Sequence, residues 1–268
     1  MNSRFPVSIE AALQQADVSW QHILRAALAA MSVADPKYLP ELDQDHYLPT
    51  EGRLFAAFAQ PLSRVRYILV GEGPYPRANS ATGVCFMDGA VGSLWSEQTD
   101  GGLSKQVNRA TSLRNLMKML MRAAGQLMPD QLNPAGVAEI AKLARAPSSS
   151  MTQSLAQFQS NLHQHGFLLL NASLVFREHV LPKKEAKPWQ VFLKHVLQGL
   201  LAECRTHGVP PPSLVLWGKI ALDLQQLPVS REFPQIVAEH PYNLSFIENS
   251  TMHTLFAPMN LLQFPAQT

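Results

Sequence analysis

The sequence predicts an α/β protein with three layers, in which helices cover both faces of a central, mainly parallel four-stranded sheet. Four short apolar runs predict the strands, and they span residues 67–70, 167–171, 214–217 and 235–240. Glycine or proline bounds these runs, which is typical of strands buried on both faces. Helical patterns lie between the runs, and this alternation of strands with helices indicates a parallel sheet.

The first well-defined helix is predicted over residues 110–125. Its apolar side chains recur at helical spacing and share one face: Leu113, Leu116, Met117, Leu120 and Ala124. We expect Thr111 or Ser112 to cap the N-terminus of this helix, because a hydroxyl can accept a hydrogen bond from an unpaired backbone N–H. Gly125 is expected to end it.

A second helix is predicted over residues 187–208, where Trp189, Phe192, Val196 and Leu200 align. Pro188 fits a position near the start of a helix, and Gly208 fits its end. The stretch from Ile9 to Met31 also has a helical period.

The chain has 268 residues, a length that fits one α/β domain with a full-size core. We therefore expect a single domain over residues 1–268, with residues 1–50 as an N-terminal helical segment packing on it. Residues 126–160 contain the stretch APSSSMTQS, and we expect an insertion or a mobile loop there.

Composition excludes several classes of protein. A net charge of +2 is too small to predict a nucleic-acid partner by itself. Cys85 and Cys204 lack CxxC spacing, so they predict neither a disulfide framework nor a four-thiolate cluster. No apolar stretch approaches the ~18 residues of a membrane span, and the N-terminus lacks the pattern of a secretory signal. We expect a cytoplasmic monomer with no membrane association and no cofactor.

The ends of the predicted strands give the first indication of function. Ligands of open α/β sheets bind outside the carboxyl ends of the strands. The segments that follow the four runs are GEGPYP, NASLVF, GKIA and HPYNLS. If the strands are neighbours, these loops converge and bring together Glu72, Tyr75, Asn171, Lys219 and His240.

Common catalytic motifs are absent from these loops. The segment GEGPYP begins like the dinucleotide-binding pattern GxGxxG, but Pro76 occupies the last glycine position and Pro74 removes a backbone amide. The chain contains no Walker lysine, no GxSxG and no HExxH. The histidines of HQH at 163–165 are interpreted as a surface pair, so no metal site is expected.

Read together, the loops resemble the uracil-DNA glycosylase superfamily, and family 1 most closely. The family motifs GQDPYH, GLCF, LLLNAVLTVRxH, FLLWGxxA and HPSPLS correspond in order to GEGPYP at 71–76, GVCF at 83–86, LLLNASLVFREH at 168–179, LVLWGKIA at 214–221 and HPYNLS at 240–245. The resemblance extends from about Ser19 to Leu262. It implies a uracil-DNA glycosylase-like fold and an enzyme that flips a base out of DNA.

The resemblance also implies roles for single residues. Leu244 would fill the space left by the flipped base, and Phe86 would stack on that base. Asn171 would pair with the edge of uracil, while Tyr75 would exclude the methyl group of thymine. His240 would donate a hydrogen bond to uracil O2 as charge develops there, assisted by backbone amides. Structural alternatives are a loop anchor for Leu244, core packing for Phe86, a strand-end cap for Asn171 and a structural histidine.

DNA contacts are implied for a further group of residues: Ser112, Gly218, Lys219, Leu244 and Ser245. The partner would be uracil-containing DNA, single- or double-stranded. One basic cluster could contact phosphates and make binding salt-dependent, or could be a solvated face: Arg177, Lys183, Lys184 and Lys187.

The first motif departs from the family pattern. The catalytic aspartate of family 1 falls at Gly73, which has no side chain, and the motif histidine falls at Pro76. Glu72 matches the glutamate in the GEGPG motif of family 4, whose enzymes act without that aspartate. The four-cysteine iron–sulfur cluster of family 4 cannot be built from two cysteines. Glu72 is therefore the candidate acid, with a surface carboxylate as the alternative.

Three hypotheses follow. The first, which we favour, is a uracil-DNA glycosylase that hydrolyses the N-glycosidic bond without metal or cofactor, with reduced or altered activity because of Gly73. The second is a catalytically inactive homologue that binds DNA, a base or a partner protein. A more distant third is a nucleotide-binding α/β protein with no role in repair.

Overall fold

The computed structural model describes residues 5–264, which form two compact units. Within these residues the first unit comprises the chain up to Gly89 together with Gly166–Leu216 and Ile220–Gln235. The second unit comprises Ala90–His165, Trp217–Lys219 and the residues from Ile236 onward.

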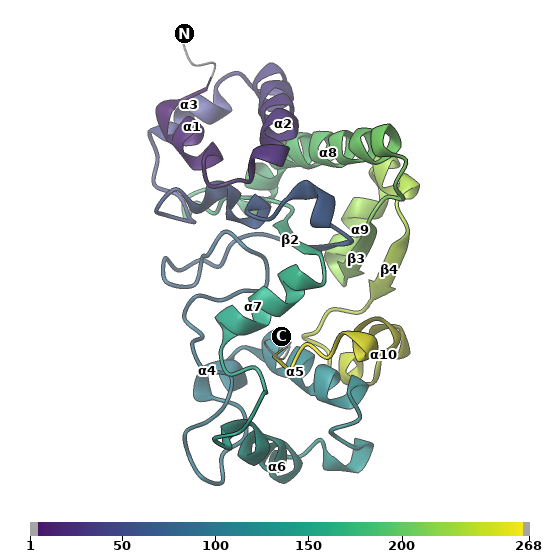
Figure 1. Ribbon diagram of the computed structural model, residues 1–268. Coiled ribbons are helices and arrows are strands. Elements are labelled where there is room, and N and C mark those ends of the chain that lie inside the picture. The colour runs from purple at the N-terminus through teal and green to yellow at the C-terminus, as the bar shows by residue number, and fades with distance from the viewer. Residues whose placement is uncertain (1–4, 265–268) are drawn as a thin grey trace. The chain divides into compact units, whose positions relative to one another are not determined.

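The predicted sheet is present, with helices packed around it (Figure 1). Its strands are β1 (Tyr67–Gly71), β2 (Phe167–Asn171), β3 (Ser213–Trp217) and β4 (Gln235–Ala238). Their order is β2-β1-β3-β4, and β1 pairs in parallel with both β2 and β3. The α/β fold class expected from the sequence is confirmed.

Strands β1, β2 and β3 are buried on both faces, as their continuous apolar runs predicted. The prediction was wrong for β4, where Val237 is 43% exposed and Gln235 and Ile236 are half-buried. Side chains alternate between the two faces of a strand. The even-numbered residues of the first three strands belong to one core cluster with the N-terminal helices: Ile68, Val70, Leu168, Leu170, Leu214 and Leu216. The alternating residues Leu69, Leu169 and Val215 are buried as well.

Helices of the first unit precede and follow its strands. They are α1 (Val7–Leu13), α2 (Gln21–Ala34), α3 (Tyr38–Asp43) and α8 (Pro182–His207). Helix α2 packs against α8 (Figure 1). The helical period from Ile9 to Met31 is interrupted between α1 and α2, because Asp17 accepts a hydrogen bond from the Ser19 N–H and starts a 3₁₀ turn there.

The prediction for the start of α8 was wrong by five residues. The helix begins at Pro182, and Pro188 lies inside it. Pro182 occupies the first helical position, where a missing N–H costs nothing, so the same preference that suggested Pro188 is met earlier in the chain. The end was predicted correctly, since Gly208 adopts the left-handed conformation that glycine favours there.

Helices of the second unit are α4 (Lys105–Arg109), α5 (Thr111–Ala123), α6 (Pro134–Arg145), α7 (Leu155–Gln164) and α10 (Ser250–Phe256). Helix α9 (Lys219–Gln225) follows β3. Short 3₁₀ turns complete the described chain: η1 (Val18–Trp20), η2 (Arg53–Phe58), η3 (Leu62–Arg64), η4 (Pro129–Gln131), η5 (Pro228–Glu232), η6 (Leu244–Glu248) and η7 (Ala257–Met259).

Helix α5 has no side-chain cap, so the prediction of Thr111 or Ser112 as its N-cap was wrong. Ala110 occupies the cap position, and it is the single residue between α4 and α5. Both hydroxyl residues already lie in the first turn of α5. Gly125 follows the last turn with a positive φ of 69°, as expected.

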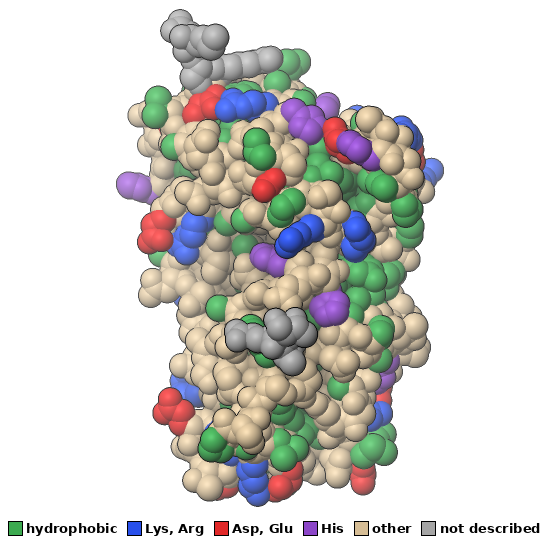
Figure 2. All heavy atoms as spheres, in the orientation of Figure 1, with side chains coloured by type: hydrophobic (Ala, Val, Ile, Leu, Met, Phe, Trp, Pro, Cys, Tyr) green, Lys and Arg blue, Asp and Glu red, His purple; other side chains and the backbone are tan. Residues whose placement is uncertain are grey.

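The segment 126–160 contains η4, α6 and the first part of α7. No helix among residues 5–264 is long and apolar enough to cross a membrane. On the face drawn in Figure 2, Lys and Arg side chains are interspersed with Asp, Glu and His, in keeping with the small net charge.

Candidate active site

In the first unit, the candidate residues gather at the adjoining ends of β1 and β2. Gly71 and Asn171 are register partners in these strands, and the Asn171 side chain is buried. A methyl group built on Gly71 would lie 2.9 Å from the Asn171 Oδ1 and 2.9 Å from the Cys85 Cβ. Because glycine has no β-carbon, the Asn171 amide can lie against the backbone at this position.

Cys85 anchors the segment GVCF across both strands. Its backbone N–H donates to the Leu169 carbonyl at 3.2 Å, and its thiol donates to the Leu69 carbonyl at 3.3 Å. Burial raises the pKa of this thiol, so it stays protonated and acts as a donor.

Phe86, the next residue, is half-buried and has a positive φ of 60°. A non-glycine residue rarely adopts this conformation, and such strain concentrates at functional sites. The Phe86 ring Cε2 would lie 3.8 Å from a methyl group on Gly71, so the ring and the Asn171 amide both border that glycine.

Tyr75 lies in the loop after β1 and is half-buried. Burial raises its pKa to about 12, with a smaller contribution from the negative charge of Asp88. Asp88 is buried and forms an ion pair with Arg77 at 3.7 Å. Asp88 was not among the predicted site residues, because it lies outside the family motifs.

Glu72 and Gly73 are exposed at the end of β1. The Glu72 carbonyl accepts a hydrogen bond from the Ser173 N–H at 3.0 Å, which ties this loop to the residues after β2. A methyl group on Gly73 would lie 3.6 Å from the Ser173 carbonyl oxygen and 3.8 Å from its Cβ. These are ordinary contact distances, so the position can accommodate a side chain.

In the second unit, His240 sits in a tight turn after β4. The Asn243 N–H donates to the His240 carbonyl at 2.9 Å. The Tyr242 N–H donates to His240 Nδ1 at 3.1 Å. Because Nδ1 accepts a hydrogen bond, a neutral His240 ring carries its proton on Nε2.

Gly218 adjoins His240 in the same unit. It has a positive φ of 62°, and a methyl group on it would lie 2.6 Å from the His240 Cβ. Its N–H donates to the Ala238 carbonyl at 3.0 Å. Lys219 is exposed at the start of α9. The structure thus brings the loops after β3 and β4 together, as the sequence predicted.

The remaining DNA-contact candidates lie in η6 and α5. Leu244 is 70% exposed at the start of η6, and Ser245 beside it is also exposed. Ser112 is half-buried in the first turn of α5, a helix that packs against η6. A leucine so exposed makes little contribution to the core, which argues against the loop-anchor alternative.

The predicted basic cluster loses one member. Arg177 is buried in the first unit, where its Nε and Nη2 donate to Glu185 at 2.7 and 3.1 Å and its Nη1 donates to Asp45 at 3.1 Å. Its guanidinium is therefore committed to two carboxylates, and the interpretation as a phosphate contact was wrong for this residue. The three lysines are exposed: Lys183, Lys184 and Lys187.

Sequence reasoning missed Asn115, a fully buried polar residue on α5. Its Nδ2 donates to the Pro241 carbonyl at 2.8 Å and to the Tyr242 carbonyl at 3.3 Å. It supports the turn that carries His240. The available signal was an asparagine among the apolar residues of an amphipathic helix, a position that requires a specific partner.

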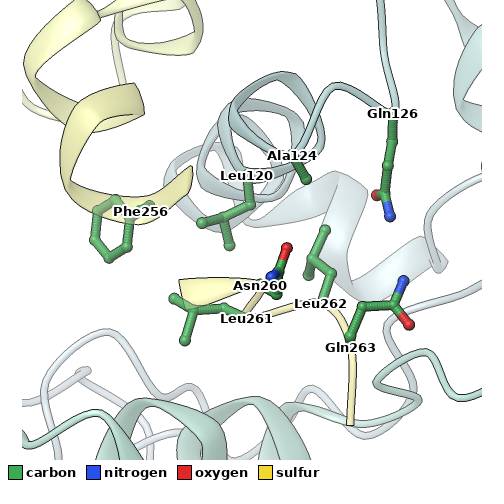
Figure 3. A pocket seen from close by; sticks show the side chains of 8 residues that line it. All are labelled: Leu120, Ala124, Gln126, Phe256, Asn260, Leu261, Leu262 and Gln263. Carbon is green, nitrogen blue, oxygen red and sulfur yellow. The ribbon is translucent and has the colours of Figure 1, made fainter. Parts of the chain in front are cut away.

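A small pocket in the second unit lies apart from the candidate residues. Figure 3 shows its lining: Leu120, Ala124, Gln126, Phe256, Asn260, Leu261, Leu262 and Gln263. Within residues 5–264, no three His, Cys, Asp or Glu side chains are grouped so that they could hold a metal ion.

Comparison with known proteins identifies the family. No family model matches the chain. It is 26% identical to a uracil-DNA glycosylase of Thermobifida fusca over 74% of this chain and 67% of the relative. It is 26% identical to a uracil-DNA glycosylase of Corynebacterium glutamicum over 85% and 80% of the two chains.

A solved structure gives a stronger match. The wild-type UNG of Nitratifractor salsuginis is 34% identical, with a TM-score of 0.85 over 98% of this chain and 100% of that one. The mimivirus uracil-DNA glycosylase, at 15% identity and a TM-score of 0.54, shares the fold. The likeness to the Nitratifractor structure spans both units of the molecule. The chain belongs to the uracil-DNA glycosylase family.

Proposed function

We propose that the protein flips uracil out of DNA and hydrolyses the bond between the base and its sugar. The observation that carries this proposal is the arrangement at the ends of β1 and β2, where the Asn171 amide and the Phe86 ring border Gly71. We further propose that this group and the His240 turn act on the same flipped nucleotide, so that residues 1–268 work as one glycosylase domain.

Recognition of uracil falls to three residues of the first unit. The Asn171 amide offers one donor and one acceptor, which match the O4 and N3–H edge of uracil and mismatch cytosine. The Phe86 ring stacks on the flipped base, and its strained backbone fixes the ring at the strand end. Tyr75 lies beside C5 of the base, where thymine carries a methyl group that the tyrosine ring excludes.

Stabilisation of the leaving base falls to His240. As the glycosidic bond breaks, negative charge develops on uracil O2, and a donor aimed at that atom lowers the barrier. Nδ1 accepts a hydrogen bond from the Tyr242 N–H, which supports a neutral ring with its proton on Nε2. The Nε2–H can then donate a hydrogen bond to O2. Backbone amides of Glu72 and Gly73 add further donors.

We assign the contacts with DNA outside the base to residues of the second unit. Leu244 enters the stack where the base has left, since its side chain is 70% exposed. Backbone amides and hydroxyls hold the phosphates on either side, contributed by Ser112, Gly218, Lys219 and Ser245. The partner is uracil-containing DNA, single- or double-stranded, and the protein acts on it as a monomer.

The glycine at position 73 leaves two candidate functions, an active glycosylase and a catalytically inactive homologue. It falls where family 1 has the aspartate that orients the attacking water, so activity is reduced or relies on Glu72 one residue earlier. Loss of such a group costs about 100-fold in rate or more. A catalytically inactive homologue that binds DNA, a base or a partner protein is the second candidate, and the missing side chain at Gly73 favours it.

Incubation with oligonucleotides that carry one uracil, followed by alkali, tests the proposal. We expect strand scission on both single- and double-stranded DNA, and its loss in Asn171→Ala and His240→Ala. Leu143→Ala, in an exposed leucine on α6, serves as a control that retains activity. If no strand scission occurs at high protein excess, the proposal of an active glycosylase is refuted. Retained binding of the same DNA would then support the inactive homologue.

Glu72→Gln tests the source of the acid. If Glu72 replaces the missing aspartate, the variant loses the excision seen in the wild-type protein. The carboxylate is exposed, so the substitution leaves folding intact and the rate reports on chemistry. An unchanged rate removes Glu72 from the mechanism and leaves His240 and the backbone donors as its basis.

A further inference from the structure

Asn115 is held in an arrangement that neither packing nor helix formation requires. The residue lies on α5, is 0% exposed, and reaches across 126 positions of the chain to the turn after β4. Its Nδ2 donates to the carbonyls of Pro241 and Tyr242 at 2.8 and 3.3 Å. Both partners are backbone atoms of the turn that carries His240.

The Pro241 carbonyl and the Tyr242 N–H belong to one peptide group. A peptide group is planar and rotates as a unit, so whatever fixes its oxygen also fixes its hydrogen. Asn115 holds the oxygen end, and the hydrogen end donates to His240 Nδ1 at 3.1 Å. The two hydrogen bonds therefore link α5 to the imidazole ring through this single peptide group.

The Oδ1 atom of Asn115 indicates that this link is maintained at a cost in folding stability. This atom is buried and has no hydrogen-bond partner among residues 5–264. A buried acceptor without a partner destabilises a fold, and an apolar residue would avoid that penalty. The donor half of the amide is thus the part that an apolar residue could not replace.

Two further contacts hold the flanks of the same turn. Asn249 Nδ2 donates to Glu239 Oε2 at 2.6 Å, and Arg122 pairs with Glu248 through two hydrogen bonds of 2.8 and 3.0 Å. These contacts hold residues on either side of the turn, while Asn115 binds the oxygen of the peptide group between Pro241 and Tyr242.

We propose that Asn115 is a positioning residue that fixes this peptide plane and thereby keeps the His240 ring oriented with its proton on Nε2. Its effect on excision rests on the proposed function, because only then does His240 donate to uracil. Its effect on the tautomer of His240 is independent of any reaction.

The chain supplies a matched control in Asn161 of α7. This asparagine is also buried, at 2% exposed, and its Nδ2 donates to the carbonyls of Leu261 and Gln263 at 2.9 and 3.1 Å. Its Oδ1 likewise has no partner among the described residues. Asn161 supports the segment that lines the pocket of Figure 3 instead of the His240 turn.

The test compares Asn115→Ala with Asn161→Ala in the full-length protein. Nitrogen-15 NMR of the histidine rings at neutral pH reports which ring nitrogen carries the proton, and His240→Gln assigns the signal. Single-turnover and steady-state excision of uracil from an oligonucleotide give the rate and KM. We expect the wild-type protein and Asn161→Ala to share one Nε2-protonated His240 signal.

Asn115→Ala should show mixed tautomers and a kcat lower by about 100-fold, with KM within about 3-fold of the control. A His240 signal and a kcat that match those of Asn161→Ala overturn the proposal. If Asn115→Ala does not fold, Asn115→Ser gives the same comparison with less loss of volume. If the wild-type protein excises no uracil, the proposed function fails, and the NMR comparison alone decides the role of Asn115.

Discussion

Gly71 and Asn171 face each other as register partners at the ends of β1 and β2, and the Asn171 Oδ1 lies only 2.9 Å from where a β-carbon on Gly71 would stand. That β-carbon would also lie 2.9 Å from the Cys85 Cβ. Cys85 is hydrogen-bonded to both β1 and β2. Neither neighbour can move away easily, so the position of the Asn171 amide depends on the absence of one methyl group at Gly71.

Gly71→Ala is therefore expected to displace Asn171 and to lower kcat/KM for uracil excision by about 10-fold or more. Overpacking should also cost about 1–3 kcal/mol of unfolding free energy. Gly92→Ala is the control, because a methyl group there meets nothing within 4 Å. Excision kinetics and urea unfolding measure both effects, and equal kcat/KM values for the two variants would contradict the account.

Tyr75 should remain protonated at unusually high pH. Burial raises its pKa from 10.0 to about 12, so the folded state binds the phenolic proton more tightly than the unfolded state. The stability that Tyr75 contributes is complete below pH 10 and is lost as pH rises toward 12. Ultraviolet difference titration of the wild-type protein against Tyr75→Phe isolates this group. A titration midpoint near 10 would show that Tyr75 is solvated.

Glu185 should be a major determinant of stability in the first unit. It is buried, accepts two hydrogen bonds from Arg177, and accepts another from the Tyr38 hydroxyl. Glu185→Ala leaves a buried arginine with one carboxylate fewer and is expected to cost about 3–5 kcal/mol. Glu139→Ala, which breaks an exposed pair with Lys142, should cost less than about 1 kcal/mol. Chemical denaturation that gave similar losses would refute the contrast.

Leu244 should matter for duplex DNA more than for single strands. A side chain that enters the base stack replaces contacts that the flipped nucleotide has left, and a single strand has fewer such contacts to replace. Leu244→Ala is expected to lower excision from duplex DNA by about 10-fold relative to single-stranded DNA. Leu143→Ala, 67% exposed on α6, is the control. Equal losses on both substrates would assign Leu244 to general binding.

The strands and their loops could be predicted from sequence because they rest on local patterns. Continuous apolar runs between glycine and proline identified all four strands, and each strand begins within one residue of its predicted start. Strand β4 ends at Ala238, before the predicted end at residue 240, and is partly exposed. The start of α8 was misplaced because two prolines, Pro182 and Pro188, satisfied the same rule and only the first begins the helix.

Contacts between side chains far apart in the chain could not be predicted from the sequence. Arg177 was predicted as part of a basic cluster, yet Asp45, 132 positions away, and Glu185 enclose its guanidinium. The support of the His240 turn by Asn115 depends on a contact across 126 positions. No spacing rule predicts such pairs, although a buried asparagine on an apolar helix face signals that a partner exists.

The rate of uracil excision by Gly73→Asp, compared with the wild-type protein under single-turnover conditions, tests the central claim most directly. A side chain at this position meets only ordinary contacts with Ser173, so the variant should fold. If the recognition residues are competent and only the water-orienting carboxylate is missing, the wild-type protein excises slowly and Gly73→Asp is about 100-fold faster. No excision by either protein would contradict the account.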